Sequence, residues 1–384
     1  MTHYLVLGAG RQGVAAVHDL ITHGEATTLT WIDSHAASLE AGLRRITQLT
    51  GFKGLRGQRV DADDRRALQP LFTEANVCFN ALPYRLSLSM TQLALEGRTH
   101  YVDLGGNTEI VKEQFELQRT HPAGEELVVL PDCGLMPGMG NVFVAYALAE
   151  LGDCAKVEVR CGGLPADPKP PLGYKLTFSV AGLTNEYFGR AQVLRGGEVR
   201  EVDTFTELEQ LDVPGVGECE AFITSGGLST TPWTFQGRID TLDYKTIRYR
   251  GHHEKFKTLL DLGLLGEDPI ALGSQNVVPR QLLHTLLEER LQFPEDHDLV
   301  VLTCDAESKQ GNGRIKLSVL DRQCEETGFT AMERCTSYSA AACAHAIASG
   351  AVEPGPKPLE SAIDPKDFVE ALNTRGIEVE VSRE

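Results

Sequence analysis

The stretch His3-Tyr4-Leu5-Val6-Leu7-Gly8-Ala9-Gly10-Arg11-Gln12-Gly13 decides the fold, because it joins an apolar run to the pattern G-x-G-x-x-G. Its first part is typical of a strand, and the apolar residues after Gly13 continue as a helix. In this context Gly8 permits the tight turn, Gly10 lets a pyrophosphate approach the backbone, and Gly13 lets the helix lie close to the strand. The stretch therefore predicts a dinucleotide site, with the pyrophosphate at the helix N-terminus.

Asp33, at the end of the next predicted strand, bears on which dinucleotide is bound. A carboxylate at this position accepts hydrogen bonds from the ribose hydroxyls of NAD and repels a 2′-phosphate. Ser34 and His35 follow it, so the loop itself holds no arginine to receive such a phosphate. We therefore expect NAD as the cofactor, ahead of NADP.

The composition restricts the class of protein. With 42% hydrophobic and 23% charged residues, the 384-residue chain resembles an ordinary soluble globular protein. Its formal net charge of −18 disfavours nucleic acids and anionic membrane surfaces as partners. We expect a cytoplasmic protein, because the sequence lacks a signal-peptide pattern and any long apolar run. The nine cysteines lack a C-x-x-C pair, so we expect reduced thiols and no metal site.

Strand-like and helix-like segments alternate through the first 130 residues, which is typical of a parallel, doubly wound Rossmann-type sheet. Strands are expected at Leu5–Leu7, Thr28–Ile32, Arg59–Val60, Val77–Asn80, His100–Leu104 and Leu127–Leu130. Ligands of such sheets bind at the carboxyl ends of the strands. The residues expected to contact the cofactor are Gly8, Gly10, Arg11, Gln12, Gly13, Asp33, Asp61, Ala81, Leu82 and Pro83.

The pattern changes near Gly152, where runs of period-two alternation follow with few helices. Such alternation predicts a largely antiparallel sheet, and Lys175–Val180 and Thr246–Tyr249 are among its expected strands. The fold class is therefore α/β: a Rossmann-type sheet followed by an α+β domain for substrate binding and dimerisation. We place the dinucleotide domain at residues 1–135, the α+β domain at 136–337, and a C-terminal segment returning to the first domain at 338–384.

Asp132-Cys133-Gly134-Leu135-Met136-Pro137-Gly138-Met139 resembles the D-x-G-x-x-P-G-M run of the saccharopine dehydrogenase family, most closely its lysine 6-dehydrogenase branch. Arg250 and Gly140 depart from the family pattern, which more often has proline and a larger apolar residue there. Further stretches similar to that branch are Asn80–Arg85, His100–Asn107, Gly162–Pro165, Pro171–Lys175 and Tyr244–His252.

The resemblance implies NAD(P)-linked oxidation of a C–N bond in an amino acid, and a homodimer. Within the branch, the reaction is oxidation of the ε-amine of L-lysine to the 6-semialdehyde, which cyclises to piperideine-6-carboxylate, with release of NADH and ammonia. Reductive condensation, as in saccharopine or carboxynorspermidine dehydrogenases, is the first alternative. An NAD-retaining deaminating lyase and a non-catalytic dinucleotide sensor are the others.

Such a reaction needs a neutral amine, whereas a lysine ammonium has an ordinary pKa of about 10.4, so the site must remove a proton. Asp103 and Asp132 end predicted strands, and each can either take this proton or cap a turn. Lys175 is a base or a solvated lysine, and His252 a proton shuttle or a helix cap. Arg248 can clamp a carboxylate, unless it lies on the sheet surface. The residues expected to bind substrate are Tyr84, Arg85, Tyr174, Glu186 and Arg248.

Overall fold

The computed structural model describes residues 2–311 and 313–384. Its first sheet is parallel throughout, in the order β3-β2-β1-β4-β5-β6, so the predicted doubly wound arrangement is confirmed. The strand order reverses between β1 and β4, where the glycine turn follows β1. The strands are β1 Thr2–Leu7, β2 Ala26–Asp33, β3 Leu55–Arg59, β4 Val77–Asn80, β5 His100–Asp103 and β6 Val129–Leu130.

Alternate side chains of β1 face two different cores. Tyr4 and Val6 pack in the core that α1, α2 and α11 cover, whereas Leu5 and Leu7 pack in the core beneath α3 and α4. Both faces are therefore covered, as a parallel sheet requires. The helices are α1 Arg11–Thr22, α2 Ala36–Thr50, α3 Arg65–Glu74, α4 Ser87–Gly97, α5 Thr108–Thr120 and α11 Ala331–Ala348.

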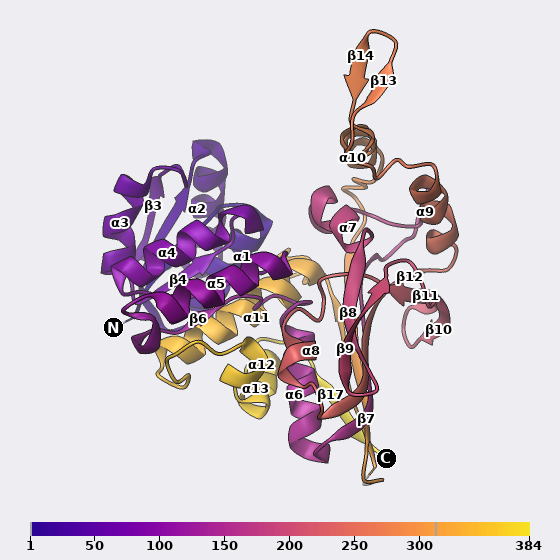
Figure 1. The fold of residues 1–384 in the computed structure, drawn as a ribbon. Helices are drawn as coiled ribbons and strands as arrows, with labels where there is room; N and C mark the ends of the chain where they lie inside the picture. Colours follow the sequence, from indigo (N-terminus) through magenta and orange to yellow (C-terminus); the bar gives the residue numbers. More distant parts are fainter. Residues whose placement is uncertain (1, 312) are drawn as a thin grey trace.

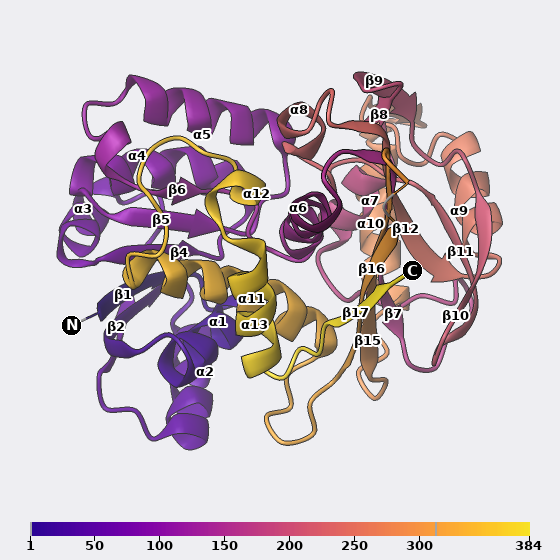
Figure 2. The ribbon, with the colours of Figure 1, turned by 90° about the horizontal axis from the view of Figure 1, so that it is seen from below.

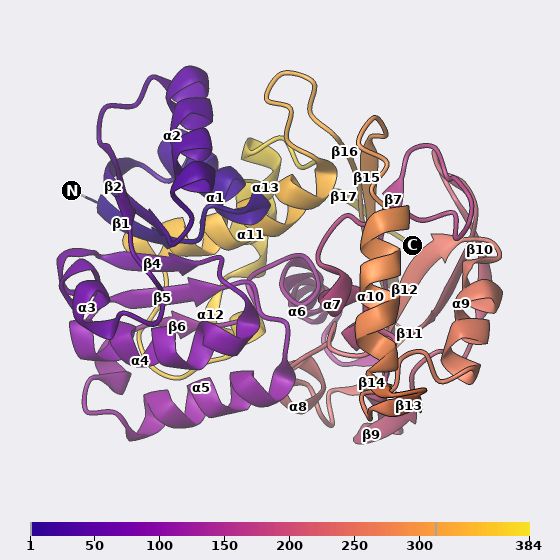
Figure 3. The same cartoon turned by 90° about the horizontal axis from the view of Figure 1, so that it is seen from above.

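The second sheet has nine strands, and the pairing of β12 with β7 is its one parallel pair within the described residues. The main path is β10-β11-β12-β7-β15-β16-β17, with β8 and β9 beside β12. Helix α6, Met139–Leu151, lies between the two sheets in Figures 2 and 3. The strands are β7 Cys154–Pro165, β8 Arg190–Arg195, β9 Glu198–Asp203, β10 Glu209–Val213, β11 Gly217–Ile223, β12 Ile239–Tyr249, β15 Asp298–Ser308, β16 Arg314–Arg322 and β17 Glu380–Arg383.

Short elements flank this sheet. The hairpin β13–β14 projects beyond α10 and away from the body (Figure 1). Their bounds are α7 Val180–Glu186, α8 Thr231–Thr234, α9 His252–Asp261, β13 Ile270–Leu272, β14 Gln275–Val277, α10 Pro279–Arg290, α12 Leu359–Ala362 and α13 Pro365–Thr374.

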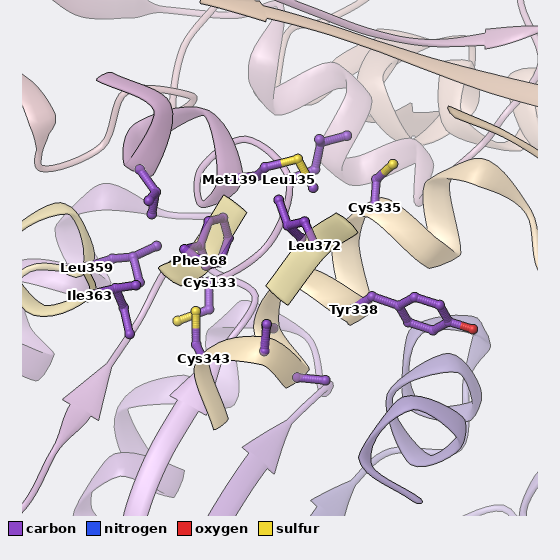
Figure 4. Close-up of a cluster of buried hydrophobic side chains, with 14 of the residues drawn as sticks. Cys133, Leu135, Met139, Cys335, Tyr338, Cys343, Leu359, Ile363, Phe368 and Leu372 are labelled. Atoms are coloured by element: carbon purple, nitrogen blue, oxygen red, sulfur yellow. The ribbon is translucent and has the colours of Figure 1, made fainter. Parts of the chain in front are cut away.

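The C-terminal segment joins both halves of the molecule. Helix α11 packs along α1, and the α12 and α13 side chains meet the loop after β6 in the apolar cluster of Figure 4. Arg375 at the end of α13 forms a buried ion pair with Asp19 of α1, at 3.0 Å between Nε and Oδ1. The final strand, β17, pairs instead with β16 of the second sheet. The segment 338–384 therefore does not return to the first domain alone.

The predicted strand Lys175–Val180 is wrong. The chain is irregular until α7 begins at Val180, where Ser179 caps the helix by accepting a hydrogen bond from the Gly182 amide. Of its alternating apolar residues, Leu176 and Val180 are buried and Phe178 is half-buried, although the segment pairs with no strand. The hairpin of β8 and β9 was not predicted. The residues of β9 are largely charged and exposed, and β8 is short, with buried Val193 and Leu194 adjacent rather than alternating.

Candidate functional site

The glycine turn has the geometry that its sequence predicts. Gly8 has a φ of +97°, which favours glycine, and Trp31 Nε1 donates a hydrogen bond of 2.8 Å to the Gly8 carbonyl. A Cβ at Gly13 would lie 2.0 Å from that same carbonyl oxygen, so the helix lies too close to the strand for a side chain. A Cβ at Gly10 would meet nothing within 4 Å. The open space there, at the N-terminus of α1, fits a dinucleotide pyrophosphate.

Asp33 is turned toward the glycine turn. Its Oδ2 accepts a hydrogen bond of 2.6 Å from the Ala9 amide, and its Oδ1 accepts one of 2.7 Å from the His35 amide. Both oxygens of the Asp33 carboxylate therefore accept hydrogen bonds from backbone amides. The carboxylate stabilises this loop in addition to any hydrogen bonds that it accepts from ribose hydroxyls.

Arg59 supplies the arginine that the loop after Asp33 lacks. In the β2–β3 register Arg59 is the partner of Asp33, and its Nε donates a hydrogen bond of 3.0 Å to the Ser34 carbonyl. The side chain is exposed, and no side chain caps the N-terminus of α2 at His35. Strand β3 thus brings a guanidinium, and α2 an N-terminus without a side-chain cap, to the position that a 2′-phosphate takes in NADP-binding folds. Pairing the ends of the predicted second and third strands would have found it.

The other predicted cofactor residues lie at three places: the start of α1, the loop after β3 and the loop after β4. Ala81 packs against Gly8, at 3.1 Å between the Ala81 oxygen and an ideal Gly8 Cβ, and the Leu82 amide donates to Asn80 Oδ1. Gln12 binds Ser337 of α11 through its side chain. The remaining three, Arg11, Asp61 and Pro83, are exposed.

Asp103 is 1% exposed and its carboxylate is saturated. Oδ2 accepts hydrogen bonds from the Tyr101 hydroxyl at 3.0 Å and from Gln114 at 2.8 Å. Oδ1 accepts hydrogen bonds from the amides of Gly105 and Asp132. Four donors around one buried carboxylate make it a fixed part of the framework that shapes the loop after β6.

Asp132 has the same kind of position in the sequence but different surroundings. It follows β6 with a φ of +63° and is 5% exposed, and its Oδ2 accepts a hydrogen bond from the Ser229 hydroxyl. Burial raises the pKa of this carboxyl to about 8, while the bond from Ser229 opposes that rise. An ideal Cβ at Gly105 would lie 1.9 Å from Oδ1, so glycine is needed for the carboxylate to lie there. Asp132 is thus poised to exchange a proton near neutral pH.

Arg248 is buried on β12, with 2% exposure. Its Nε donates a hydrogen bond of 2.7 Å to the Tyr187 hydroxyl, which in turn lies 3.1 Å from His252 Nε2. His252 Nδ1 faces the Leu172 carbonyl at 3.1 Å and therefore carries the ring proton. Burial, aided by the charge of Arg248, lowers the pKa of His252 to about 3. His252 is thus a neutral prop for Tyr187 and Arg248 at neutral pH, which argues against the proton-shuttle hypothesis.

Two further predicted residues surround Arg248. The Tyr174 ring lies under the guanidinium, at 4.7 Å from Cζ to the ring centroid, and its buried hydroxyl has no hydrogen-bond partner among the described residues. Burial raises the pKa of Glu186 to about 7, and nearby Arg248 opposes that rise. The cluster of Arg248, Glu186 and Tyr174 therefore combines a fixed cation, an acidic group and a free hydroxyl. Tyr187 was not predicted as part of it, because only the fold brings it to Arg248.

Of the remaining candidates, only Tyr84 approaches this cluster. The Lys175 ammonium group donates a hydrogen bond to the Asp296 backbone carbonyl, which argues against a role for Lys175 as the catalytic base. The Tyr84 hydroxyl accepts a hydrogen bond of 3.2 Å from Asn185, the neighbour of Glu186, and so approaches the cluster from the first sheet. Arg85 is exposed.

Residues 2–311 and 313–384 contain neither a cluster of metal ligands nor a helix suited to cross a membrane. Nowhere among them do three or more His, Cys, Asp or Glu side chains gather as metal ligands would. None of their helices combines the length and apolar character that a membrane span requires.

Comparisons with known proteins agree across both sheets. The family model described as "Saccharopine dehydrogenase NADP binding domain" matches residues 4–128, and "Saccharopine dehydrogenase C-terminal domain" matches residues 134–377. "Saccharopine dehydrogenase [NADP(+), L-glutamate-forming]" of Saccharomyces cerevisiae is 24% identical over 302 residues, which cover 76% of this chain and 65% of that protein. The protein of the same name from Schizosaccharomyces pombe is 23% identical over 229 residues, covering 57% and 50%.

The chain thus spans about half to two thirds of the length of these relatives. An apo structure of the L-Glu-forming saccharopine dehydrogenase from Saccharomyces cerevisiae superimposes with a TM-score of 0.78 at 18% identity, covering 100% of both chains. This likeness shows a shared fold.

Proposed function

Because the chain belongs to the saccharopine dehydrogenase family, we propose that it oxidises a C–N bond of an amino acid with a pyridine nucleotide. The observation that carries the proposal is that buried Arg248 lies close enough to Glu186 for its charge to act on that carboxyl group, since a cation near an acid matches the carboxylate and ammonium of an α-amino acid. The glycine turn and the open space at Gly10 would hold the dinucleotide.

Each residue has one task in this proposal. Arg248 binds the substrate carboxylate, while Glu186 and the free Tyr174 hydroxyl face the α-ammonium group and the carboxylate oxygens. Asp132, at the carboxyl end of the parallel sheet, takes the proton from the reacting amine, so that the nitrogen lone pair can expel a hydride. The nucleotide, when bound, accepts that hydride. The domain division at residues 135 and 337 and the homodimer remain predictions, as does the cytoplasmic location.

The ε-amine of L-lysine is our first candidate for the reacting group. One fixed cation in the cluster suits a substrate with one carboxylate, as lysine has. Condensation to saccharopine is the second candidate, because the relatives carry that name. Its product bears more than one carboxylate and would need further cations. Arg250 is exposed and paired with Glu218, whereas Arg280 is paired with Glu267 through Nη1 and keeps a buried Nη2 that has no partner among the described residues. Arg280 is therefore the candidate for a second cation.

An amino-acid panel tests the proposal. The purified chain is mixed with NAD or NADP and with L-lysine, L-saccharopine or L-glutamate, and absorbance at 340 nm is recorded with ammonia release. Oxidation of lysine yields reduced nucleotide and ammonia in equal amounts. Reduced nucleotide from saccharopine without ammonia would establish the second candidate. Ammonia without reduced nucleotide would establish a lyase, and nucleotide binding without any turnover a sensor.

We further propose NADP as the preferred cofactor, since Arg59 and the N-terminus of α2 face the place of a 2′-phosphate. This preference competes with the one for NAD that Asp33 suggests. Arg59→Ala is expected to raise the Kd for NADPH about 10- to 100-fold, as loss of charge-assisted hydrogen bonds does, and to leave that for NADH within about twofold. Nucleotide fluorescence measures both constants.

Arg56→Ala is the matched control, since Arg56 is an exposed arginine on the same strand. It removes an equal charge farther from Ser34 and should leave both constants nearly unchanged. An equal loss of NADPH affinity in the two variants would assign the effect to net charge. An Arg59→Ala variant that keeps its NADPH affinity would contradict the role of Arg59.

A further inference from the structure

Ser229 lies on the segment Thr224–Thr230, which leaves β11 of the second sheet and reaches back toward the loop after β6. Its φ is +42°, a left-handed conformation that few serines adopt. Its hydroxyl donates a hydrogen bond to Asp132 Oδ2, and the residue is 6% exposed. A strained backbone therefore delivers one hydroxyl group from the second sheet to the carboxylate that follows the first.

Neighbouring contacts fix this hydroxyl in place. Asn141 of α6 donates a hydrogen bond of 2.8 Å to the carbonyl of Leu228, on one side of Ser229. On the other side, the Thr230 hydroxyl donates one of 2.9 Å to Glu360 of α12. Because both flanking residues are held, Ser229 cannot turn away from Asp132 without breaking buried hydrogen bonds, which costs free energy.

The surroundings of Asp132 are acidic, so a hydrogen-bond donor is needed to stabilise its ionised form. Asp103 after β5 and Glu360 on α12 both bear negative charge toward it, and Cys133 is its neutral neighbour. The two acidic groups, together with burial, favour the protonated form of the Asp132 carboxyl. Ser229 is the side-chain hydrogen-bond donor to Asp132 within the described residues, and a donor favours the ionised form that can accept a proton.

We propose that Ser229 is a positioning residue, which holds the Asp132 carboxylate in the orientation and charge state needed to take a proton from the substrate amine. This inference rests on the role proposed for Asp132. It also ties proton transfer to the contact between the loop after β6 and the segment Thr224–Thr230, since the acceptor follows the first sheet and the donor follows a strand of the second. If the two parts separate, Asp132 loses its donor.

Two substitutions separate the effect of the Ser229 hydroxyl from the effect of its strained backbone. Ser229→Gly removes the hydroxyl and suits the left-handed φ, whereas Ser229→Ala removes it and keeps the strain. We expect both to shift the acid limb of the pH profile of kcat/KM upward by about one to two units, in line with loss of a hydrogen bond to a charged group. At neutral pH this shift lowers kcat/KM about 10- to 100-fold. The Kd for NADPH should not change.

Ser225→Ala is the matched control, because that hydroxyl binds a backbone carbonyl, that of Asn185, in the same segment. Its acid limb should stay at the wild-type position. If Ser229 had a purely structural role, the glycine variant would be more active than the alanine variant, and the acid limb would stay at the wild-type position in both. That result would overturn the inference. If Asp132→Asn remains fully active, the function proposed for Asp132 fails. If it is inactive while the serine variants titrate as wild type, only the inference on Ser229 fails.

Discussion

Replacing Asp132 with asparagine is expected to lower kcat about 10²- to 10⁴-fold, which is the usual contribution of a general base. The amide is nearly the same size as the carboxylate and can still bind the Ser229 hydroxyl, but it cannot accept a proton. Because Asp132 lies after β6, away from Asp33 and Arg59, the Kd for NADPH should stay within about twofold. Stopped-flow turnover and nucleotide fluorescence measure the two quantities.

The role of Asp132 as a base also predicts how the oxidation rate changes with pH. Burial raises the pKa of Asp132 to about 8, so in the wild type the base becomes ionised as the pH rises through that value. The oxidation rate should therefore reach half of its maximum near pH 8 and level off about one pH unit higher. Asp132→Asn should lose this limb altogether.

Asp64→Asn is the matched control. Asp64 is an exposed aspartate in another loop at the carboxyl edge of the sheet, where it caps α3, a task that asparagine performs equally well. Its turnover should match the wild type. Full activity of Asp132→Asn, with the acid limb intact, would exclude Asp132 as the base.

Asp103 and Asp132 also show which features of the site could be predicted from the sequence and which could not. Asp103 and Asp132 both end predicted strands of one sheet, and periodicity together with the glycine turn was enough to predict that sheet. Their difference lies in contacts that no local pattern encodes. Gln114 from α5 and the Tyr101 hydroxyl saturate Asp103, whereas Asp132 meets a serine 97 residues away in sequence.

Arg59 and Tyr187 illustrate the same limit. Arg59 becomes a neighbour of Asp33 through strand pairing, and Tyr187 becomes one of Arg248 through the packing of α7 against the second sheet. Alternation predicted strands wherever it occurred, including Lys175–Val180, because it reports which side chains become buried and not whether the backbone pairs. The fold class was therefore predictable, while the assignment of roles within the site depended on long-range contacts.

Arg248→Gln is expected to raise the KM for an amino-acid substrate about 30-fold to several-thousand-fold. Truncating one partner of a buried, hydrogen-bonded charge pair costs about 2–5 kcal/mol, which corresponds to that range. The affinity for the nucleotide should not change, since Arg248 belongs to β12 of the second sheet. Arg250→Gln is the control, because Arg250 lies two residues further on, exposed and paired with Glu218.

A substrate without the carboxylate turns this prediction into a test of what Arg248 binds. Cadaverine is lysine without its carboxylate, so the wild type should use it poorly, and Arg248→Gln should use it no worse. If Arg248 serves instead to hold Tyr187 and His252 in place, the substitution disturbs the cluster for both amines, and the two KM values rise together. A loss confined to lysine means that the guanidinium contacts the carboxylate directly, because only that contact is absent from the diamine.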